Sequence, residues 1–291
     1  MTEQPELAYE GEGAGRSPRV DAKPTFIGKY SVLMKAEWAV LLAYRSETVI
    51  WMLGAFIQPM VSLAVWLSIS GAQGEIAGYS AYDYVRYFIG VLLVERLTRS
   101  WDVWDVDRDI REGTYSAKLL RPFHPVHWSL CSNLVYKFFF ASLLIPAWLI
   151  LSIPFPVLRF PVEWIAGLAA IWAIAVSAAM TFVIGYEFGL LAFWSNRATA
   201  IYSLYEMTHL FLAGRIAPLS MFPDWIAVAA KWLPFYYTVG LPVDLLTGKM
   251  NGQTMLIGQN LAVQAAWLLI FMTVFRIMWR AGLKKYGAAG G

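Results

Sequence analysis

Several ionisable side chains lie inside long apolar segments of this chain, where charge is costly and usually serves a function. Glu95 and Arg99 lie one helical turn apart and could pair with each other. The alternatives are a buried structural pair between Glu206 and an Arg or Lys, or side chains that reach outward to an interface. We take Glu95, Arg99, Glu206 and His209 as candidates to line a substrate path. The full set is Glu95, Arg96, Arg99, Lys137, Glu187, Glu206 and His209.

Residue spacing argues against two kinds of chemistry. His209 has no His or Cys partner at metal-ligand spacing, so we expect no metal site. Ser203 lies on a different face of the same helix, which argues against a serine–histidine dyad there, although a serine from another segment could still approach. The single cysteine, Cys131, excludes an internal disulfide and a cysteine-based zinc site.

The segments that carry these residues have the composition of membrane-spanning helices. Hydrophobic residues make up 58% of the chain, charged residues 15%, and the mean hydropathy is +0.52. Because a helix needs ~20 residues to cross ~30 Å of hydrocarbon, five apolar blocks and a more polar sixth predict an all-α integral membrane protein with six transmembrane helices. The net charge of +3 is too small and too dispersed to indicate a nucleic-acid partner. The expected spans are residues 47–69, 84–103, 128–153, 164–194, 199–219 and 255–278.

Three further segments complete the expected organisation around a transmembrane domain at 47–280. Residues 1–24 are rich in Gly, Glu, Pro and Ser and should form a disordered cytoplasmic tail. Residues 25–46 have apolar side chains at helical spacing with charges between them, which predicts an amphipathic helix in the membrane interface. The alternative is that this helix extends the first span. Residues 281–291 should form a second cytoplasmic tail.

Basic residues in the short loops fall mainly on one side of a six-span topology. The opposite side keeps mainly Arg159, Lys231 and Lys249. The positive-inside rule therefore places both termini in the cytoplasm. We see no internal sequence repeat, so a carrier built from inverted repeats gets no support. The cytoplasmic set is Lys29, Lys35, Arg45, Arg108, Arg111, Lys118, Arg121, Arg197, Arg280, Lys284 and Lys285.

A charged segment, residues 105–127, follows the second span and has the pattern of two short helices. The pattern breaks at Gly113, resumes briefly, and is stopped by Pro122 and Pro125. Such a segment would present a short rigid knob on the cytoplasmic side. The alternative is an ordinary solvated loop, but apolar residues recur at helical spacing among the charges. They are Ile110, Leu119 and Leu120.

An apolar segment before the last span, residues 218–248, is divided by prolines into pieces of about 8–11 residues, too short to cross the bilayer. Such pieces can enter and leave one face if their free backbone groups are buried in protein. We therefore expect a pair of re-entrant helices on the outer side. A seventh span is the alternative, and the prolines and charges count against it. They are Pro223, Pro234, Pro242, Asp224, Lys231 and Asp244.

Three short motifs resemble the membrane subunits of type-2 ABC transporters, in the branch of bacterial permeases encoded beside a separate ATPase. They are Arg111-Glu-Gly113, Leu119-Leu-Arg-Pro122 and Leu233-Pro-Phe-Tyr-Tyr237. The resemblance covers nearly the whole chain after the tail. It implies six helices per subunit, an N-terminal interfacial helix, a coupling helix after the second span and outer re-entrant helices. We take Phe235, Tyr236 and Tyr237 as candidates for an outer gate.

The chain has no Gly-x-x-x-x-Gly-Lys-[Ser/Thr] loop to hold nucleotide phosphates. The resemblance therefore implies that ATP and Mg are bound by partner ABC ATPase subunits, with no cofactor in this chain. Alternating charges suit an interface that must form in one register, although a solvated face would explain them too. The residues expected to dock the ATPase are Arg108, Asp109, Arg111, Glu112, Gly113, Leu119, Leu120, Arg121 and Pro122.

Three functions remain open at this point. The first is an exporter permease of the bacterial inner membrane, working with a second identical or related permease subunit among membrane lipids. It would move a lipid-like or other amphiphilic cargo. The second is an ion-coupled carrier that uses Glu95, Glu187 and Glu206. The third is an intramembrane enzyme built on His209. Only the permease should be inactive without a separate ATPase.

Overall fold

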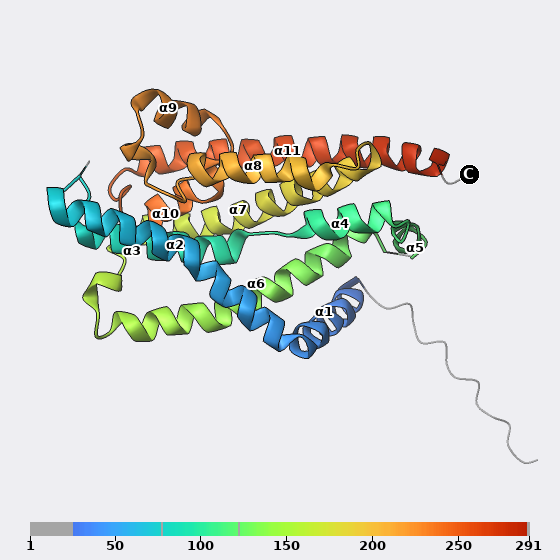
Figure 1. The fold of residues 1–291 in the computed structure, drawn as a ribbon, viewed down its shortest axis with the longest axis horizontal. Coiled ribbons are helices and arrows are strands. Elements are labelled where there is room, and N and C mark those ends of the chain that lie inside the picture. Colours follow the sequence, from blue (N-terminus) through green and yellow to red (C-terminus); the bar gives the residue numbers. More distant parts are fainter. Residues whose placement is uncertain (1–25, 77, 122, 290–291) are drawn as a thin grey trace, which may run out of the picture.

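A computed structural model describes residues 26–76, 78–121 and 123–289. The expected tail at 1–24 and the docking candidate Pro122 lie outside the described residues. The described chain is helical, with one isolated β-bridge between Ile76 and Tyr79 (Figure 1). The α-helices are α1 (Phe26–Ala43), α2 (Arg45–Gln73), α3 (Ala81–Thr98), α4 (Asp102–Arg111), α5 (Tyr115–Leu119), α6 (Pro125–Ser152), α7 (Trp164–Leu190), α8 (Ala198–Leu212), α9 (Asp224–Trp232), α10 (Gly240–Leu246) and α11 (Thr254–Ala289), and the short 3-10 helices are η1 (Pro156–Leu158), η2 (Leu191–Phe193), η3 (Leu219–Met221) and η4 (Tyr236–Thr238).

Helix α7 is the centre of the fold and packs against α3, α4, α8, α10 and α11. Its first half carries a buried row of alanines, which lets neighbouring backbones approach closely. On α11, the fully buried Gln264 donates from Nε2 to the Ala173 carbonyl at 3.0 Å and to the Tyr237 carbonyl at 2.8 Å. This amide joins α7, η4 and α11. The alanines are Ala166, Ala169, Ala170 and Ala173.

Four helices of the described chain are long and apolar enough to cross a membrane. They agree with the expected first, third, fourth and sixth spans. Helix α11 also continues to Ala289, so most of the expected tail at 281–291 is helical. The class prediction, an all-α membrane protein, is confirmed. The four candidate spans are Ser46–Gly71, Pro125–Ser152, Trp164–Phe193 and Thr254–Tyr286.

The expected second span, 84–103, is wrong at its end, because α3 stops at Thr98 and α4 starts anew at Asp102. The Thr98 carbonyl accepts a hydrogen bond from Thr181 Oγ1 on α7. Ser100 Oγ donates to the Asp102 carboxylate, which also accepts from Asn133 Nδ2 at 3.1 Å. Polar groups that would lie inside one long helix are therefore used to fix a break between two helices.

The expected fifth span, 199–219, is also too long. Helix α8 has 15 residues, about 22 Å at ~1.5 Å per residue. The chain turns at Gly214, whose φ is +79° and whose carbonyl accepts a 2.7 Å hydrogen bond from Tyr87 Oη. A side chain on Gly214 would lie 2.5 Å from that oxygen. Beyond the turn, α9 and α10 are two short helices in the segment where we expected a re-entrant pair.

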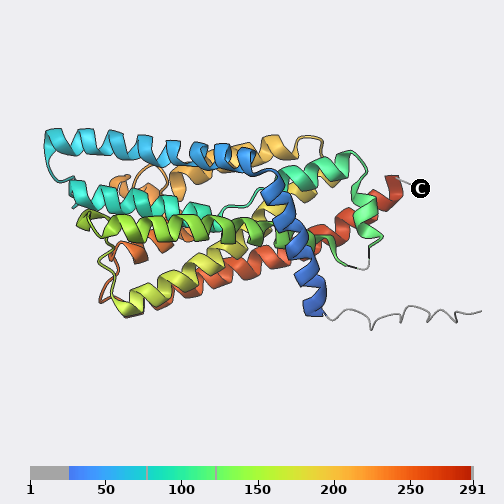
Figure 2. The same cartoon turned by 90° about the horizontal axis from the view of Figure 1, so that it is seen from below.

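Helix α1 is separate from α2, because the chain bends at Tyr44 and α1 runs across the beginning of α6 (Figure 2). Tyr30 Oη lies 2.6 Å from His127 Nδ1, and the rings of Trp38 and Phe139 meet edge to face at 6.3 Å. Its other side exposes apolar residues, a pattern that suits a helix lying on a bilayer. These include Ile27, Val32, Val40 and Leu42.

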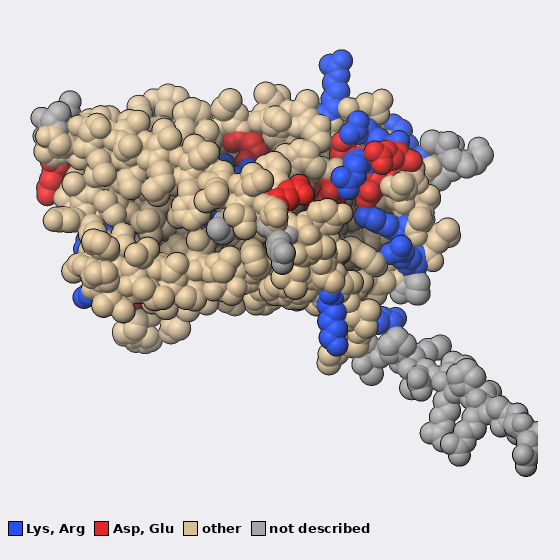
Figure 3. Space-filling model, turned by 60° about the horizontal axis from the view of Figure 1, so that its bottom comes forward, with Lys and Arg blue, Asp and Glu red and all other residues tan. Residues whose placement is uncertain are grey.

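Charged side chains gather at one end of the molecule. Figure 3 shows Lys, Arg, Asp and Glu concentrated over the end that carries α4, α5 and the end of α11. On the face in view, the rest of the molecule has a small charged patch near its middle and a few charged residues at the opposite end. Helix α1 also lies toward this end (Figure 1). The arrangement fits a long apolar body inside the bilayer and one polar end outside it.

Candidate functional site

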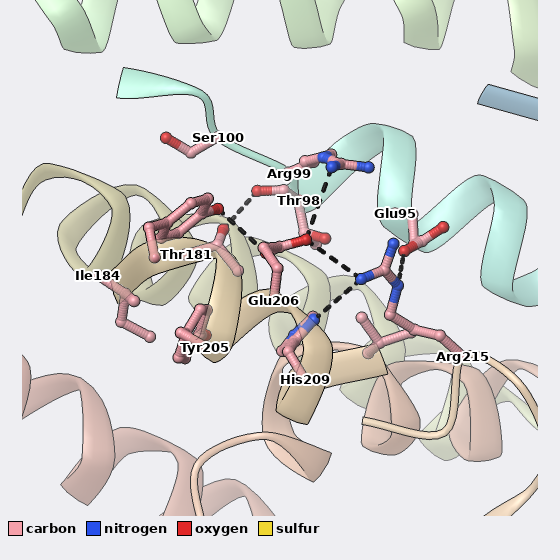
Figure 4. Close-up of a pocket in the computed structure, with 12 residues that line it drawn as sticks. Glu95, Thr98, Arg99, Ser100, Thr181, Ile184, Tyr205, Glu206, His209 and Arg215 are labelled. Carbon is pink, nitrogen blue, oxygen red and sulfur yellow. Dashed lines mark hydrogen bonds and ion pairs between the residues drawn. The ribbon is translucent and has the colours of Figure 1, made fainter. Parts of the chain in front are cut away.

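Three of the expected path residues meet around an arginine that sequence reasoning did not identify. Glu95 lies in the last turn of α3, while Glu206 and His209 project from one side of α8. Arg215 follows the Gly214 turn and points back at all three (Figure 4). We call these side chains, together with Arg99, the charge network.

The charge network is held by ion pairs in which every carboxylate has a cationic partner. Arg215 pairs with Glu95 through Nε, and its NH1 lies 3.4 Å from Glu206 Oε2. Arg99 NH2 lies 3.6 Å from the same oxygen. Tyr202 Oη donates to Glu206 Oε1 at 3.1 Å. Two carboxylates facing two guanidinium groups leave little net charge, which makes burial of the group tolerable.

His209 is buried and both of its ring nitrogens have partners. Thr238 Oγ1 donates to the Phe235 carbonyl at 2.6 Å, so His209 Nε2 must donate its proton to Thr238 Oγ1, 2.7 Å away. Nδ1 is then an acceptor and faces Arg215 NH1 at 3.4 Å. A histidine engaged on both sides orients its neighbours and has no free nitrogen for catalysis.

The space inside the charge network is about 30 Å³, room for one water-sized molecule. A cargo cannot enter a cavity of this size. No group of three or more His, Cys, Asp or Glu residues among the described residues is placed to hold a metal ion. The geometry therefore favours a structural lock that ties α3 to α8 and to the turn after α8.

The expected pairing of Glu95 with Arg99 is wrong, since Glu95 pairs with Arg215 and Arg99 turns to Glu206. A buried pair between Glu206 and an Arg was one of the alternatives, and the structure has it. Arg215 could have been found from the sequence, because it lies at the end of the same apolar block as Glu206. Glu187 is buried on α7 outside the charge network.

A second, much larger cavity of about 800 Å³ lies beside the charge network. We call it the aromatic cavity, because five of its eleven lining residues carry an indole or phenol ring. Arg99 lines both cavities, so the two are neighbours. The rings of Trp101 and Tyr136 meet edge to face at 4.2 Å in the wall. The lining comes from α2, from the break between α3 and α4, and from α6, with Tyr44, Glu47, Thr48, Trp51, Gly54, Arg96, Arg99, Trp101, Trp104, Asp105 and Tyr136.

The expected cytoplasmic knob is formed by α4, a turn at Gly113 and α5. The φ of Gly113 is +76°, a backbone conformation that other residues rarely adopt. Three pairs stabilise the knob: Arg108 with Asp105 at 2.8 Å, Arg111 with Asp107 at 2.7 Å, and Lys118 with Asp109. We define the knob as residues 102–121.

The knob is anchored to the body through its buried face. Tyr115 Oη lies 2.8 Å from Tyr186 Oη on α7, and Tyr286 Oη on α11 donates to the Gly113 carbonyl at 3.1 Å. A side chain on Gly189 would lie 2.6 Å from Val106 Cβ, so this glycine lets α4 pack directly on α7. Movement of the knob would therefore be transmitted to the central helix.

The docking candidates differ in exposure. Asp109 is buried, and its carboxylate is engaged by Lys118 and Thr114, so we assign it to the interior of the knob. Leu119 is half-buried, whereas Leu120 is 88% exposed. Arg121 is exposed, with its guanidinium 4.8 Å from the Trp128 ring centroid. Also exposed are Arg108, Arg111, Glu112 and Gly113.

The outer gate candidates lie in the packed interior. Tyr236 Oη donates to Asp244 Oδ2 at 2.8 Å, and Tyr237 Oη donates to the Lys231 carbonyl at 2.8 Å. Phe235 is half-buried, with its ring centroid 5.5 Å from that of Tyr205. These rings brace the segment between α9 and α10, and any gate would have to move this segment as a unit.

No curated protein matches the chain. Residues 56–290 match the family described as ABC-2 family transporter protein. The match begins inside α2 and runs through the knob, the charge network and α11, so it covers most of the described residues. The helical fold with its apolar helices, the knob and this match agree, and the chain belongs to the ABC-2 transporter family as a multi-pass membrane permease.

Proposed function

We propose that this chain is the membrane subunit of an ATP-driven exporter and that it moves an amphiphilic, lipid-like cargo across the bacterial inner membrane. ABC-2 family membership implies ABC ATPase partners. The proposal extends this to outward transport, with both termini in the cytoplasm and with a second identical or related permease subunit.

The observation that carries the proposal is the knob. It combines an exposed surface, which includes Arg108 and Leu120, with a buried face fixed to the central helix. A mobile loop could bind a partner but would absorb its movement. A knob tied to α7 through Tyr115 and Tyr186 passes that movement into the bilayer. ATP bound and hydrolysed by a partner ATPase could thereby change the membrane-embedded helices.

Two charged side chains of the charge network that are partly exposed support a second membrane subunit. The Arg99 and Glu206 side chains are 34% and 24% exposed. Charged groups in a bilayer are costly unless they face protein or water. A second subunit packed over α3 and α8 would cover this pair.

The competing functions have less support. An enzyme built on His209 would need a free nitrogen and room for a substrate, whereas both nitrogens are engaged and the cavity holds about 30 Å³. An ion-coupled carrier using Glu95, Glu187 and Glu206 would need the three carboxylates on one path. Glu187 is not part of the charge network.

Site-specific photo-crosslinking tests the docking surface. A photoreactive amino acid is placed at Leu120, and the matched control position is Trp164, which is 75% exposed at the other end of the body. In membranes that contain the transporter, we expect crosslinks to an ABC ATPase from position 120 and none from position 164. Equal crosslinking at both positions, or none at position 120, would contradict the proposal.

A double variant, Arg108→Glu with Leu120→Asp, tests coupling. Both side chains are exposed, so the protein should still fold and insert. Arg111 is left intact because it pairs with the buried Asp107. We expect this variant to lose both its association with the ATPase and ATP-driven transport. Normal transport would contradict the assignment of the knob as the docking surface.

A further inference from the structure

The aromatic cavity combines a cargo-sized volume with a buried charge. Its volume, about 800 Å³, falls within the ~300–1,000 Å³ of small-molecule sites. A third cavity, of about 320 Å³ between α1 and the start of α6, has almost entirely apolar walls. The charge network encloses only about 30 Å³.

Arg96 is the unusual residue in the aromatic cavity. Its side chain lines the cavity, and the residue is only 6% exposed. Its Nε has no hydrogen-bond partner, and Arg96 takes part in no ion pair among the described residues. Its guanidinium interacts with the Tyr136 hydroxyl and, more weakly than an ion pair, with the Glu95 carboxylate. A buried guanidinium without a carboxylate of its own is costly. An anion inside the cavity would supply the missing partner.

The acidic residues nearby are engaged by groups other than Arg96. Glu95 is paired with Arg215, and Asp105 is paired with Arg108 at 2.8 Å. Glu47 lies on the exposed first turn of α2, where its carboxylate accepts a hydrogen bond from Trp51 Nε1 at 3.4 Å. The second cavity arginine, Arg99, is only partly balanced by Glu206 at 3.6 Å. At the inner wall, three guanidinium groups therefore face two carboxylates, those of Glu95 and Glu206, while Glu47 and Asp105 lie at the exposed rim.

The surroundings of the cavity fit an apolar tail as well as an anionic head. Five of the eleven lining residues carry an indole or phenol ring, and such rings pack against both alkyl chains and polar groups. On α2, beside the cavity, Ile50, Leu53 and Ile57 are exposed apolar side chains. The cavity also lies near the start of α2 and of α4, and α4 belongs to the knob.

We propose that the aromatic cavity binds the anionic headgroup of an amphiphile, a phosphate or carboxylate on an apolar tail, with Arg96 as the anion-binding residue and Arg99 at its inner wall. The proposal rests on the proposed function, because it makes this cavity the place where cargo enters the exporter. The tail would lie along the exposed face of α2. A free anion shares the headgroup chemistry but lacks the tail.

Equilibrium binding to the purified chain in a non-ionic detergent tests the proposal without any ATPase. The probes are labelled lysophosphatidic acid, inorganic phosphate as competitor, and an alkyltrimethylammonium cation of matched chain length. We expect saturable binding of lysophosphatidic acid and no comparable binding of the cation. Arg96→Gln should weaken lysophosphatidic acid binding about tenfold or more, and Arg96→Lys should weaken it less.

Matched variants separate a lost site from a damaged fold. Arg86→Gln removes an arginine from the other end of α3 and should bind like the unmodified chain. Gly54→Trp fills the cavity from α2 and leaves the Arg96 residue unchanged, and a Cβ atom added at Gly54 meets nothing within 4 Å. Gly71→Trp is its control on the same helix, also in open space and outside the cavity.

Three results would overturn the proposal: unchanged binding in both Arg96→Gln and Gly54→Trp, equal loss in the Arg86 and Gly71 controls, or saturation of the site by inorganic phosphate alone. The binding and transport measurements together also distinguish failure of the exporter function from failure of the proposed anion site. Specific binding without ATP-driven transport in the assembled complex would contradict the exporter and leave the site standing. Transport that is indifferent to Gly54→Trp would contradict the site and leave the exporter standing.

Discussion

Two neighbouring regions, the charge network and the aromatic cavity, share Arg99 but treat buried charge in opposite ways. In the charge network every carboxylate has a cationic partner, His209 is engaged on both nitrogens, and there is room for about one water. In the aromatic cavity Arg96 is buried without an ion pair and faces about 800 Å³ of space. Paired charge around a space too small for a cargo indicates structure, and charge without an ion pair beside a large space indicates a binding site.

The largest effect is expected from breaking the charge network at its centre. Arg215→Met leaves Glu95 buried without its cation, which should lower the free energy of unfolding by about 3–5 kcal/mol. The matched variant in the cavity, Arg96→Met, removes a charge that has no ion-pair partner and should be neutral or stabilising. Thermal unfolding of both variants in the same detergent measures the difference. Equal destabilisation would contradict the conclusion that Arg215 serves stability and Arg96 serves binding.

A smaller effect is expected at Thr238. Thr238→Val keeps the shape of the side chain but removes the hydroxyl that accepts from His209 Nε2. The buried nitrogen is left without a partner, at a cost of about 1–3 kcal/mol. Denaturant or thermal unfolding measures the loss. Thr208→Val is the control, because that exposed hydroxyl bonds only to a carbonyl of its own helix. If Thr238→Val were as mild as the control, His209 would not be held as described.

The smallest contrast compares two exchanges that each remove one donor to a carboxylate. Tyr202→Phe removes the hydroxyl that donates to Glu206 and should lower stability by about 1 kcal/mol. Trp51→Phe removes an indole N–H that bonds to Glu47 on the exposed rim of the aromatic cavity, at 3.4 Å. We expect no measurable change in thermal stability for Trp51→Phe. A larger loss there than for Tyr202→Phe would show that the cavity rim, too, is built for stability.

The helical membrane fold could be predicted from the sequence because long apolar blocks leave few alternatives in a bilayer. The break at Gly113 could be predicted from the residue type. The ends of α3 and α8 could not, because they depend on contacts with distant segments. The Thr98 carbonyl is taken by Thr181 on α7, and the Gly214 turn is fixed by Tyr87 on α3.

The candidate site shows the same division. Ionisable residues in apolar blocks correctly pointed to a special region, but local helical spacing suggested the wrong partner for Glu95. Arg215 reaches it from a segment more than a hundred residues away. The aromatic cavity was not predicted, because its walls come from α2, the break between α3 and α4, and α6, which only the folded chain brings together.

Affinity purification of the chain from its native host in a mild detergent, followed by identification of the co-purifying proteins and an assay of ATP hydrolysis, tests the central claim most directly. We predict that a stoichiometric ABC ATPase co-purifies with the chain and that the eluate hydrolyses ATP. When the variant with Arg108→Glu and Leu120→Asp is purified in the same way, the ATPase and the ATP hydrolysis should both be absent. A chain that purifies without any nucleotide-binding subunit, and that still moves cargo when only a proton gradient is supplied, would contradict the central claim.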